Sequence, residues 1–506
     1  MRRRGEREIP VNLAEHILER AALVPHRIAI SDGHEERTYK QLTKRVQQVA
    51  SSLRHDGHTN QTVALLSGNR MEFAEFVLGA IYAGCTPVLL DPKWSPAELE
   101  QVIRQCAPGL IVSEACFAAD LTGRYSGIPQ IYFGRGQVSG SYEAWVAGFG
   151  PEAEAASSPE LLFIGYTSGT TGIPKGYMRT HESWFSSLEA TEKAFSLNRM
   201  QHVLAPGPFV HSLSLFALLQ SLYSRATFHL LPEFDAERVL TLCSRVPDMI
   251  LFVVPAMTEA LLRQAESSNA GVSIQALISS GGKWPVSSIP KCRERFNGVR
   301  LYEYYGSSEA SYISYLELTG AEPQDSLGQP FSGVELLICD EQFREVPQGT
   351  VGELYIRSDM IFSGYHLLPE ETARVFRDGW LRTGDYVYQD RQMHLRLAGR
   401  AGSMIKSGGL KVFPEEVEAV LLRHPDIREA IVFGIPDERW GEQVTLLIQW
   451  QGRERLTLDE IRKYCRPYLA SYKLPKKLIN VEEFSYTGSG KIARQLMKSR
   501  AVKGLT

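Results

Sequence analysis

The chain has 506 residues, 43% of them hydrophobic and 22% charged, and a formal net charge of −3 at pH 7. A length well above about 300 residues predicts two or more domains, because single hydrophobic cores stop growing near that size. The nearly balanced charge excludes a general electrostatic attraction to nucleic acid, so we expect no nucleic-acid partner.

The hydropathy pattern predicts no integral membrane association. The apolar stretch FVLGAIYAGCTPVLL, residues 76–90, is interrupted by Gly84 and Pro87. It falls short of the roughly 18 apolar residues of a transmembrane helix and predicts a buried helix followed by a buried strand. Seven scattered cysteines without C-x-x-C pairs favour reduced thiols in a cytoplasmic protein over a disulfide framework or a zinc site.

Apolar, β-branched runs alternate with helical patterns through the first 330 residues. This alternation is typical of parallel sheets covered by helices. The predicted strands are Thr62–Ser67, Pro87–Leu90, Gly109–Val112, Leu161–Tyr166, Thr227–Leu231, Met249–Val254 and Ala276–Ser279. The predicted helices between them include Tyr39–Leu53, Pro96–Cys106 and Ala236–Arg245.

The last third of the chain has a different pattern. Short strands in VELLICD, GELYIRS and HLRLAG, separated by Gly, Pro and Asp turns, predict a compact β subdomain over residues 332–398. The pattern restarts after Arg400-Ala401-Gly402 with helices at Pro414–Leu422 and Leu458–Cys465 and strands at Ala430–Phe433 and Val444–Gln449. We therefore predict an α/β protein with a large domain over residues 1–399 and a small α+β domain over residues 400–506.

The segment LFIGYTSGTTGIPKG, residues 162–176, joins a buried strand to a loop of hydroxyls and glycines that ends in Lys175. Backbone N–H groups of glycine-rich turns form anion-binding concavities, and a lysine adds a compact charge, so the loop suits a polyphosphate. A solvated surface loop is the alternative interpretation. The spacing excludes a Walker A loop, because Pro174 stands where the second glycine should be and Gly176 follows the lysine.

Six separated segments, in order, resemble the signature motifs of the acyl-adenylate-forming superfamily, most closely its acyl-CoA synthetases. They are LFIGYTSGTTGIPKG, YEYYGSSEAS, GELYIRS, GWLRTGDYVYQD, GRAGSMIKSGGLKVFPEEVE and YTGSGKIAR. The resemblance covers nearly the whole chain. It implies attack of a carboxylate on the α-phosphate of Mg·ATP, release of pyrophosphate, and displacement of AMP from the acyl-adenylate by a thiol.

The resemblance assigns catalytic, phosphate and metal roles to particular residues. Lys491 matches the catalytic lysine that bridges the substrate carboxylate and the α-phosphate, and Glu309 matches the Mg²⁺ ligand. His211 matches a position near the acyl pocket and the carboxylate, although a lone histidine in an apolar stretch is more often structural. The loop that would hold the β- and γ-phosphates contributes Thr167, Ser168, Gly169, Thr170, Thr171 and Lys175.

Other residues match nucleotide and thiol contacts of the family. Tyr305 would stack on adenine, with Tyr304 as the packed neighbour, while Asp385 would accept hydrogen bonds from the ribose hydroxyls. The remaining expected contacts are Gly281 with adenine or the acyl group, Gly306 and Ser308 with the nucleotide, Arg400 with ribose or phosphate, and Gly408 and Gly409 beside the pantetheine tunnel. Lys283 and Trp284 have no assigned role, and Trp440 has two interpretations, a CoA contact or a packed aromatic.

Two departures from the patterns of related enzymes bear on the nature of the acid. Amino-acid-activating relatives place an aspartate where this chain has Val210, so an ammonium group would be buried without a partner. Asparagine, typical of dihydroxybenzoate-type relatives, is replaced by Ser212. Fatty or other simple carboxylic acids are thus favoured, with chain length and oligomeric state open.

The acceptor of the acyl group has two candidates. No carrier domain follows Lys491, so free coenzyme A is favoured as the thiol. A stand-alone enzyme that loads a separate carrier protein, and a catalytically inactive relative, are the alternatives. Relatives rotate the small domain about an aspartate or lysine at the position of Gly402, and glycine could serve the same hinge.

Overall fold

The computed structural model describes residues 12–134, 140–151, 154–156, 160–167, 174–197, 201–266, 272–285, 287–296, 298–323, 325–408, 410–452, 454–485 and 492–504. Residue contacts divide the chain into two compact units. Unit 1 comprises residues 1–318, 331–334 and 357–379, and unit 2 comprises residues 319–330, 335–356 and 380–506. The domain boundary at residue 400 stays a prediction, whereas the α/β fold class is confirmed.

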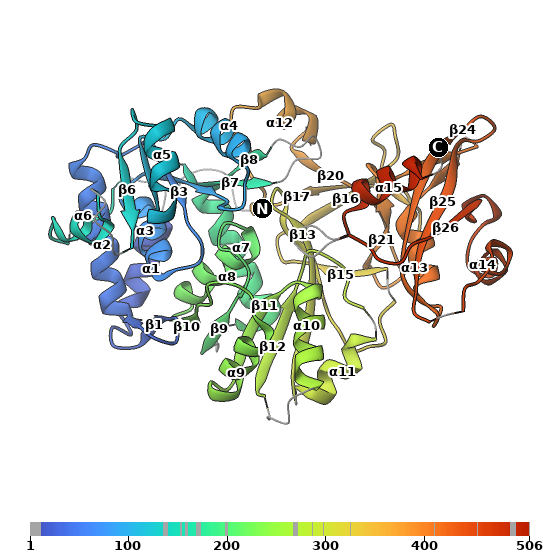
Figure 1. Cartoon of the computed structure of the whole chain (residues 1–506), viewed down its shortest axis with the longest axis horizontal. Helices are drawn as coiled ribbons and strands as arrows, with labels where there is room; N and C mark the ends of the chain where they lie inside the picture. The colour runs from blue at the N-terminus through green and yellow to red at the C-terminus, as the bar shows by residue number, and fades with distance from the viewer. Residues whose placement is uncertain are drawn as a thin grey trace. The chain divides into compact units, whose positions relative to one another are not determined.

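Unit 1 contains two mainly parallel sheets with helices between their strands (Figure 1). One sheet has the order β14-β13-β12-β11-β9-β10-β1-β2 within this unit, and the other has the order β18-β8-β7-β4-β3-β5-β6. The strands of the first sheet are β1 (Ile28–Ser31), β2 (Glu36–Thr38), β9 (His202–Leu204), β10 (Thr227–His229), β11 (Met249–Val253), β12 (Ile274–Ser279), β13 (Arg300–Ser307) and β14 (Ser311–Glu317). Those of the second are β3 (Thr62–Leu66), β4 (Thr86–Leu90), β5 (Leu110–Glu114), β6 (Gln130–Phe133), β7 (Leu161–Thr167), β8 (Lys175–Thr180) and β18 (Gly364–Tyr365).

The helices of unit 1 agree with the expected alternation. They are α1 (Leu13–Ala21), α2 (Tyr39–His55), α3 (Met71–Tyr82), α4 (Pro96–Cys106), α5 (Ala118–Arg124), α6 (Tyr142–Ala147), α7 (His181–Phe195), α8 (Ser212–Tyr223), α9 (Ala236–Arg245), α10 (Pro255–Glu266), α11 (Ser288–Arg295) and α12 (Pro369–Val375). The apolar stretch at residues 76–90 is the end of the buried helix α3 and the buried strand β4, as predicted. Within the described part of the chain, no helix combines the length and the apolar character that crossing a bilayer requires.

The second sheet departs from a purely parallel arrangement at the edge that carries the glycine-rich loop. Strands β7 and β8 form an antiparallel hairpin, and β18 then pairs antiparallel with β8. The sequence predicted β7, but β8 has no continuous apolar run, since Lys175 and Arg179 lie within it. The hairpin therefore depends on strand pairing and not on a local hydropathy pattern.

Unit 2 contains the predicted β subdomain and a second sheet. The strands of the β subdomain have the order β16-β17-β20-β21-β15. Those of the second sheet have the order β23-β22-β25-β24, with β26 beside β25. The strands are β15 (Ser326–Pro330), β16 (Glu335–Cys339), β17 (Gly352–Arg357), β20 (Trp380–Gln389), β21 (Leu395–Arg400), β22 (Ile405–Ser407), β23 (Leu410–Val412), β24 (Ile427–Asp437), β25 (Gly441–Trp450) and β26 (Lys477–Asn480). Its helices are α13 (Pro414–Leu421), α14 (Leu458–Cys465) and α15 (Arg494–Lys503).

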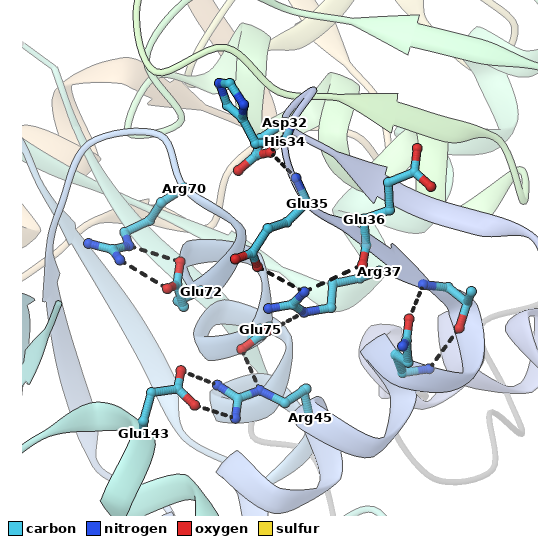
Figure 2. Close-up of polar contacts among 12 residues, drawn as sticks. Asp32, His34, Glu35, Glu36, Arg37, Arg45, Arg70, Glu72, Glu75 and Glu143 are labelled. Atoms are coloured by element: carbon cyan, nitrogen blue, oxygen red, sulfur yellow. Dashed lines mark hydrogen bonds and ion pairs between the residues drawn. The ribbon is translucent and has the colours of Figure 1, made fainter. Parts of the chain in front are cut away.

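A buried ion-pair network ties three helices of unit 1 together (Figure 2). Glu75 on α3 is fully buried, and one of its carboxylate oxygens accepts a hydrogen bond from Arg45 Nε on α2 at 2.8 Å. The outer nitrogens of Arg45 pair with both oxygens of Glu143 on α6, at 2.8 and 3.0 Å. Burial raises the pKa of the Glu75 carboxyl, and the charge of Arg45 opposes that rise.

We predict that the two carboxylates contacting Arg45 contribute very differently to stability. Glu75→Ala should lower the free energy of unfolding by about 1–3 kcal/mol, because it removes the fully buried carboxylate that pairs with Arg45, whose own side chain is 18% exposed. Glu143→Ala, a matched control whose carboxylate is 65% exposed, should cost at most about 1 kcal/mol. Urea denaturation followed by circular dichroism measures both, and equal losses would contradict the prediction.

Candidate nucleotide and acyl site

The glycine-rich loop is attached to both strands of the β7–β8 hairpin. Thr167 ends β7 and pairs across the hairpin with Lys175, which begins β8. The backbone thus fixes both ends of the loop at one edge of the sheet. Four expected phosphate contacts within the loop, Ser168, Gly169, Thr170 and Thr171, lie outside the described residues.

Lys175 has an acidic and an aromatic neighbour in unit 1. Its Nζ lies 2.9 Å from Glu371 Oε2 on α12 and 5.7 Å from the centre of the Tyr365 ring on β18. The hydrogen bond from Lys175, followed by its charge, lowers the pKa of Glu371. Neither Glu371 nor Tyr365 was among the residues expected at the site.

Glu309 lies in the tight turn that joins β13 to β14. Its Oε1 accepts a hydrogen bond from the Tyr365 hydroxyl at 2.9 Å, and its backbone oxygen accepts one from Phe362 N at 2.8 Å. Gly306 is required before this turn, because a Cβ there would lie 1.9 Å from Ser311 O. Burial, and then the nearby Glu309, raise the pKa of Tyr365, which therefore stays a hydrogen-bond donor at neutral pH.

A chain of hydroxyls joins the acyl-side segment to the segment expected at the α-phosphate. Ser308 Oγ lies 3.1 Å from Ser212 Oγ, and Ser212 Oγ lies 2.9 Å from the Tyr177 hydroxyl. Ser212 is the first residue of α8, and Tyr177 comes from the buried middle of β8. Two residues that are 96 positions apart in sequence thus meet, while the roles expected of their segments stay predictions.

His211 precedes α8 and lies at the rim of this group. Its side chain is 52% exposed, and its Nε2 lies 3.7 Å from Asp91 Oδ2. Val210 beside it is buried. Desolvation lowers the pKa of His211, and the charge of Asp91 opposes that fall, so the ring is neutral at neutral pH. A neutral imidazole can donate one hydrogen bond to a substrate carboxylate, and that role stays a prediction.

The expected adenine segment contains one packed tyrosine and one glycine with a left-handed backbone. Tyr304 packs on Tyr312, with ring centroids 4.6 Å apart, whereas its partly buried neighbour Tyr305 is the residue expected at adenine. Gly281 has φ +84°, a conformation that favours glycine just after the end of β12.

Lys283 and Trp284, which had no assigned role, both contact one buried carboxylate. Lys283 Nζ pairs with Glu303 Oε1, and Trp284 N donates to Glu303 Oε2 at 2.8 Å. Trp284 is itself buried in the hydrophobic core around β11 and β12. These contacts give the two residues a structural role.

Within unit 2, the expected ribose ligand is held by a cation. Asp385 on β20 is buried, and its Oδ1 lies 3.0 Å from Arg400 Nε, directly opposite on β21. Thr383 Oγ1 accepts the hydrogen bond of Asp385 N at 3.1 Å. The structure thus brings together two predicted site residues, while their contacts with a nucleotide stay predictions.

The expected pantetheine segment lies against Trp440. Gly408 has φ +62° and donates from its N to Trp440 O at 2.7 Å, and a Cβ there would lie 3.1 Å from the Trp440 ring. Lys476 Nζ lies 3.8 Å from the centre of the same ring and 2.8 Å from Ser407 Oγ. Gly409 lies outside the described residues.

The expected catalytic lysine, Lys491, also lies outside the described residues, but both flanks of its loop are described. Ala493 N donates to Ser485 O at 2.8 Å and closes the loop. Arg494 then forms an ion pair with Glu418, a buried carboxylate on α13 that also accepts from Val432 N at 2.6 Å. The loop is therefore anchored to the core of unit 2.

Family models and relatives identify the class of protein. The family model described as AMP-binding enzyme matches residues 17–366, and the one described as AMP-binding enzyme C-terminal domain matches residues 416–491. The chain therefore belongs to the AMP-binding enzyme family. The resemblance to acyl-adenylate-forming enzymes is confirmed.

Curated relatives from two bacteria resemble nearly the whole chain. A Bacillus subtilis (strain 168) protein named uncharacterized acyl-CoA ligase YhfT is 33% identical over 485 residues, covering 94% of this chain and 95% of that protein. The Staphylococcus aureus (strain MRSA252) protein named putative long chain fatty acid-CoA ligase VraA is 31% identical, covering 95% and 96%. The prediction of an AMP-forming acid–thiol ligase is confirmed at this level.

The names of proteins whose solved structures have the same fold indicate that they act on different compounds. The amide bond synthetase McbA from Marinactinospora thermotolerans has a TM-score of 0.85 at 26% identity, covering 96% of this chain and 99% of that one. The O-succinylbenzoate coenzyme A synthetase MenE from Bacillus subtilis, in complex with AMP, has a TM-score of 0.81 at 26% identity, covering 96% and 98%. The fold alone therefore leaves the acid and the acceptor open.

His181, the residue after β8, has a structural role in this arrangement. It begins α7, is buried, and accepts a hydrogen bond at Nδ1 from Leu13 N at 3.0 Å, which fixes the start of α1. Burial lowers the pKa of His181 to about 4. The imidazole is therefore neutral in the folded protein at neutral pH.

We predict that His181 makes the protein acid-sensitive. Between pH 6.5 and about 4, His181 binds a proton in the unfolded chain but not in the folded protein. The free energy of unfolding therefore falls as the pH falls through this range. The loss at pH 4 is on the order of 3 kcal/mol. His181→Asn, whose side-chain oxygen can replace Nδ1 as acceptor without titrating, should flatten urea-unfolding free energies plotted against pH. An unchanged slope would contradict the prediction.

Proposed function

We propose that this enzyme activates a fatty acid with ATP, releases pyrophosphate, and transfers the acyl group from acyl-AMP to coenzyme A. The observation that carries the proposal is the contact between Ser212 and Ser308. It joins the segment proposed to hold the acid to the segment proposed to hold the α-phosphate. A carboxylate bound beside this contact would lie close to the proposed α-phosphate position, the kind of proximity that lowers a barrier.

Several residues are proposed to contact the nucleotide. In unit 1, Lys175 and the loop at residues 167–171 would bind the β- and γ-phosphates, and Tyr305 would stack on adenine. In unit 2, Asp385, which forms an ion pair with Arg400, would accept hydrogen bonds from the ribose hydroxyls. Lys491 would bridge the carboxylate and the α-phosphate, where two anions must approach each other.

Glu309 suits a magnesium ion that is bound together with the phosphates. Magnesium usually takes one or two carboxylates and completes its shell with phosphate oxygens and water. Across the described ranges, no group of three or more His, Cys, Asp or Glu side chains gathers to hold a metal without a substrate. The ion would supply neutralisation of phosphate charge, and Tyr365 would orient the Glu309 carboxylate toward it.

The acyl side favours an apolar acid. Val210, Leu215 and Phe216 are buried around the start of α8, and the position that would pair with an ammonium group is the apolar Val210. Burying an unpaired ammonium is costly, so amino acids should be rejected. The relative named as a putative long chain fatty acid-CoA ligase supports a fatty acid.

The small domain has a surface suited to the phosphates of coenzyme A. A pocket of about 510 Å³ in unit 2 is lined by Arg462, Arg466 and Lys476, and Lys476 lies over the Trp440 ring next to Gly408. Guanidinium and ammonium groups bind phosphates, and the tryptophan offers a face for a base or the pantetheine arm. A carrier protein, whose pantetheine arm lacks the nucleotide, is the alternative acceptor.

The cysteines support a reaction in the cytoplasm. All seven are free thiols, and Cys85, Cys106, Cys243, Cys292, Cys339 and Cys465 are buried. Thiols that persist without pairing are typical of proteins in a reducing compartment.

A panel of acids tests the proposal. We expect AMP release that requires CoA with a medium- or long-chain fatty acid and no turnover with the common amino acids. Lys491→Ala should lower acyl-adenylate formation by several orders of magnitude but spare thioester formation from supplied acyl-adenylate. Amino-acid-dependent pyrophosphate exchange would refute the substrate class, and acyl transfer to a carrier protein but not to CoA would favour the alternative acceptor.

Substitutions at Gly402 test the proposal that a small domain beginning near residue 400 rotates about this residue. In this conformation Gly402 has no left-handed φ, and no atom lies within 4 Å of the position that a Cβ would take, so a side chain would fit. Gly402→Ala should therefore retain both half-reactions. Gly402→Pro, which fixes φ near −65°, should abolish one half-reaction and spare the other if Gly402 is the hinge. Equal retention of both activities in a folded proline variant would place the hinge elsewhere.

A further inference from the structure

The phosphate-loop lysine already has an anionic partner within unit 1. Lys175 Nζ and Glu371 Oε2 lie 2.9 Å apart, the spacing of a charge-assisted hydrogen bond. The two residues are 196 positions apart in sequence, so the pair is formed by the fold and not by a local turn. A carboxylate oxygen at this distance is an anionic acceptor of the Nζ hydrogen bond, as a phosphate oxygen would be.

The position of Glu371 is fixed by a framework of backbone contacts. His366 N donates to Gly176 O at 2.7 Å, directly beside Lys175, and Tyr365 pairs with Tyr177 across the β18–β8 ladder. Thr372 Oγ1 accepts from Tyr365 N at 2.9 Å and thereby holds α12 against β18. The helix that carries Glu371 is thus built onto the strand that carries Lys175.

Each residue of the Lys175–Glu371 pair can exchange the other for a different charged group. The side chains of Lys175 and Glu371 are 26% and 31% exposed, so water and ligands reach both. Glu371 also pairs with Arg374 on its own helix, which offers the carboxylate a second cation when Lys175 leaves. A polyphosphate that approached Lys175 would therefore replace one anion with another instead of meeting an unpaired cation.

We infer that Glu371 is a positioning residue that holds Lys175 in the absence of nucleotide and competes with the terminal phosphates for it. The inference rests on the proposed role of Lys175 in binding the β- and γ-phosphates. Competition weakens the binding of ATP and of the pyrophosphate product alike. Because the phosphates must leave after the first half-reaction, a built-in competitor promotes the release of pyrophosphate.

Titration calorimetry with inorganic pyrophosphate and Mg²⁺ tests the inference without depending on turnover. Glu371→Gln keeps the size and a hydrogen-bonding oxygen but removes the charge, so it should tighten pyrophosphate binding about two- to fivefold, the range of a partly exposed ion pair. The matched control is Glu370→Gln on the same helix, since Glu370 is 90% exposed and lies 4.0 Å from Arg374. It should leave the Kd unchanged.

A second variant separates this inference from the proposed function. Lys175→Ala should weaken pyrophosphate binding, and adding Glu371→Gln to it should bring no further change, as expected when two residues act through one contact. If Lys175→Ala leaves the Kd unchanged, the phosphate role of Lys175 is refuted and the inference with it. If Lys175→Ala weakens binding while Glu371→Gln weakens it or leaves it unchanged, only the competition is refuted, and Glu371 merely orients the lysine or has no effect.

Discussion

The pairing of β18 with β8 is the constraint on which the proposed phosphate site depends. Strand β8 begins with Lys175, and the two residues of β18 lie opposite Tyr177 and Met178. This short ladder brings Tyr365 to Glu309, 56 residues earlier in the chain, and Glu371 to Lys175, 196 residues earlier. Without it, the cation and the carboxylate proposed for Mg·ATP would lose these fixed partners.

The same ladder explains how a strongly charged site remains compatible with a folded protein that lacks its ligand. An isolated charge in a partly buried position is costly unless it is paired or hydrogen-bonded. Glu371 satisfies Lys175, and the Tyr365 hydroxyl satisfies one oxygen of Glu309. In unit 2, Arg400 does the same for Asp385. Each of these proposed ligands of the nucleotide therefore has an internal partner that a substrate group could join or replace.

Local sequence patterns predicted the regular elements well because those elements depend on local periodicity. The helices at Pro96–Cys106, Ala236–Arg245 and Leu458–Cys465 have the predicted bounds, and the last has a capping box at Thr457 and Glu460. Strand β24 is longer than predicted, over Ile427–Asp437, because the residues on either side of its apolar middle are held by pairing with β25. A hydropathy pattern does not predict such pairing between strands.

Candidate site residues could be predicted from the sequence only where they lie within the ordered motifs. The motifs indicated Ser308, Glu309 and Asp385, and the fold brings Ser308 to Ser212 and Asp385 to Arg400. Tyr365 and Glu371 gave no comparable signal, since a tyrosine in a two-residue strand and a glutamate on a seven-residue helix look like ordinary surface residues. Their contacts are long-range, and only the three-dimensional pairing of β18 with β8 reveals them.

Unit 2 fixes the chain on both sides of the segment that contains the proposed catalytic lysine. Loops are mobile unless their ends are fixed, and here the hydrogen bond from Ala493 to Ser485 and the ion pair of Arg494 with Glu418 fix both ends. Glu418 is buried and also bonded to the β24 backbone, so the anchor continues into the core beneath α13. The described residues that flank Lys491 are therefore held by the core of unit 2.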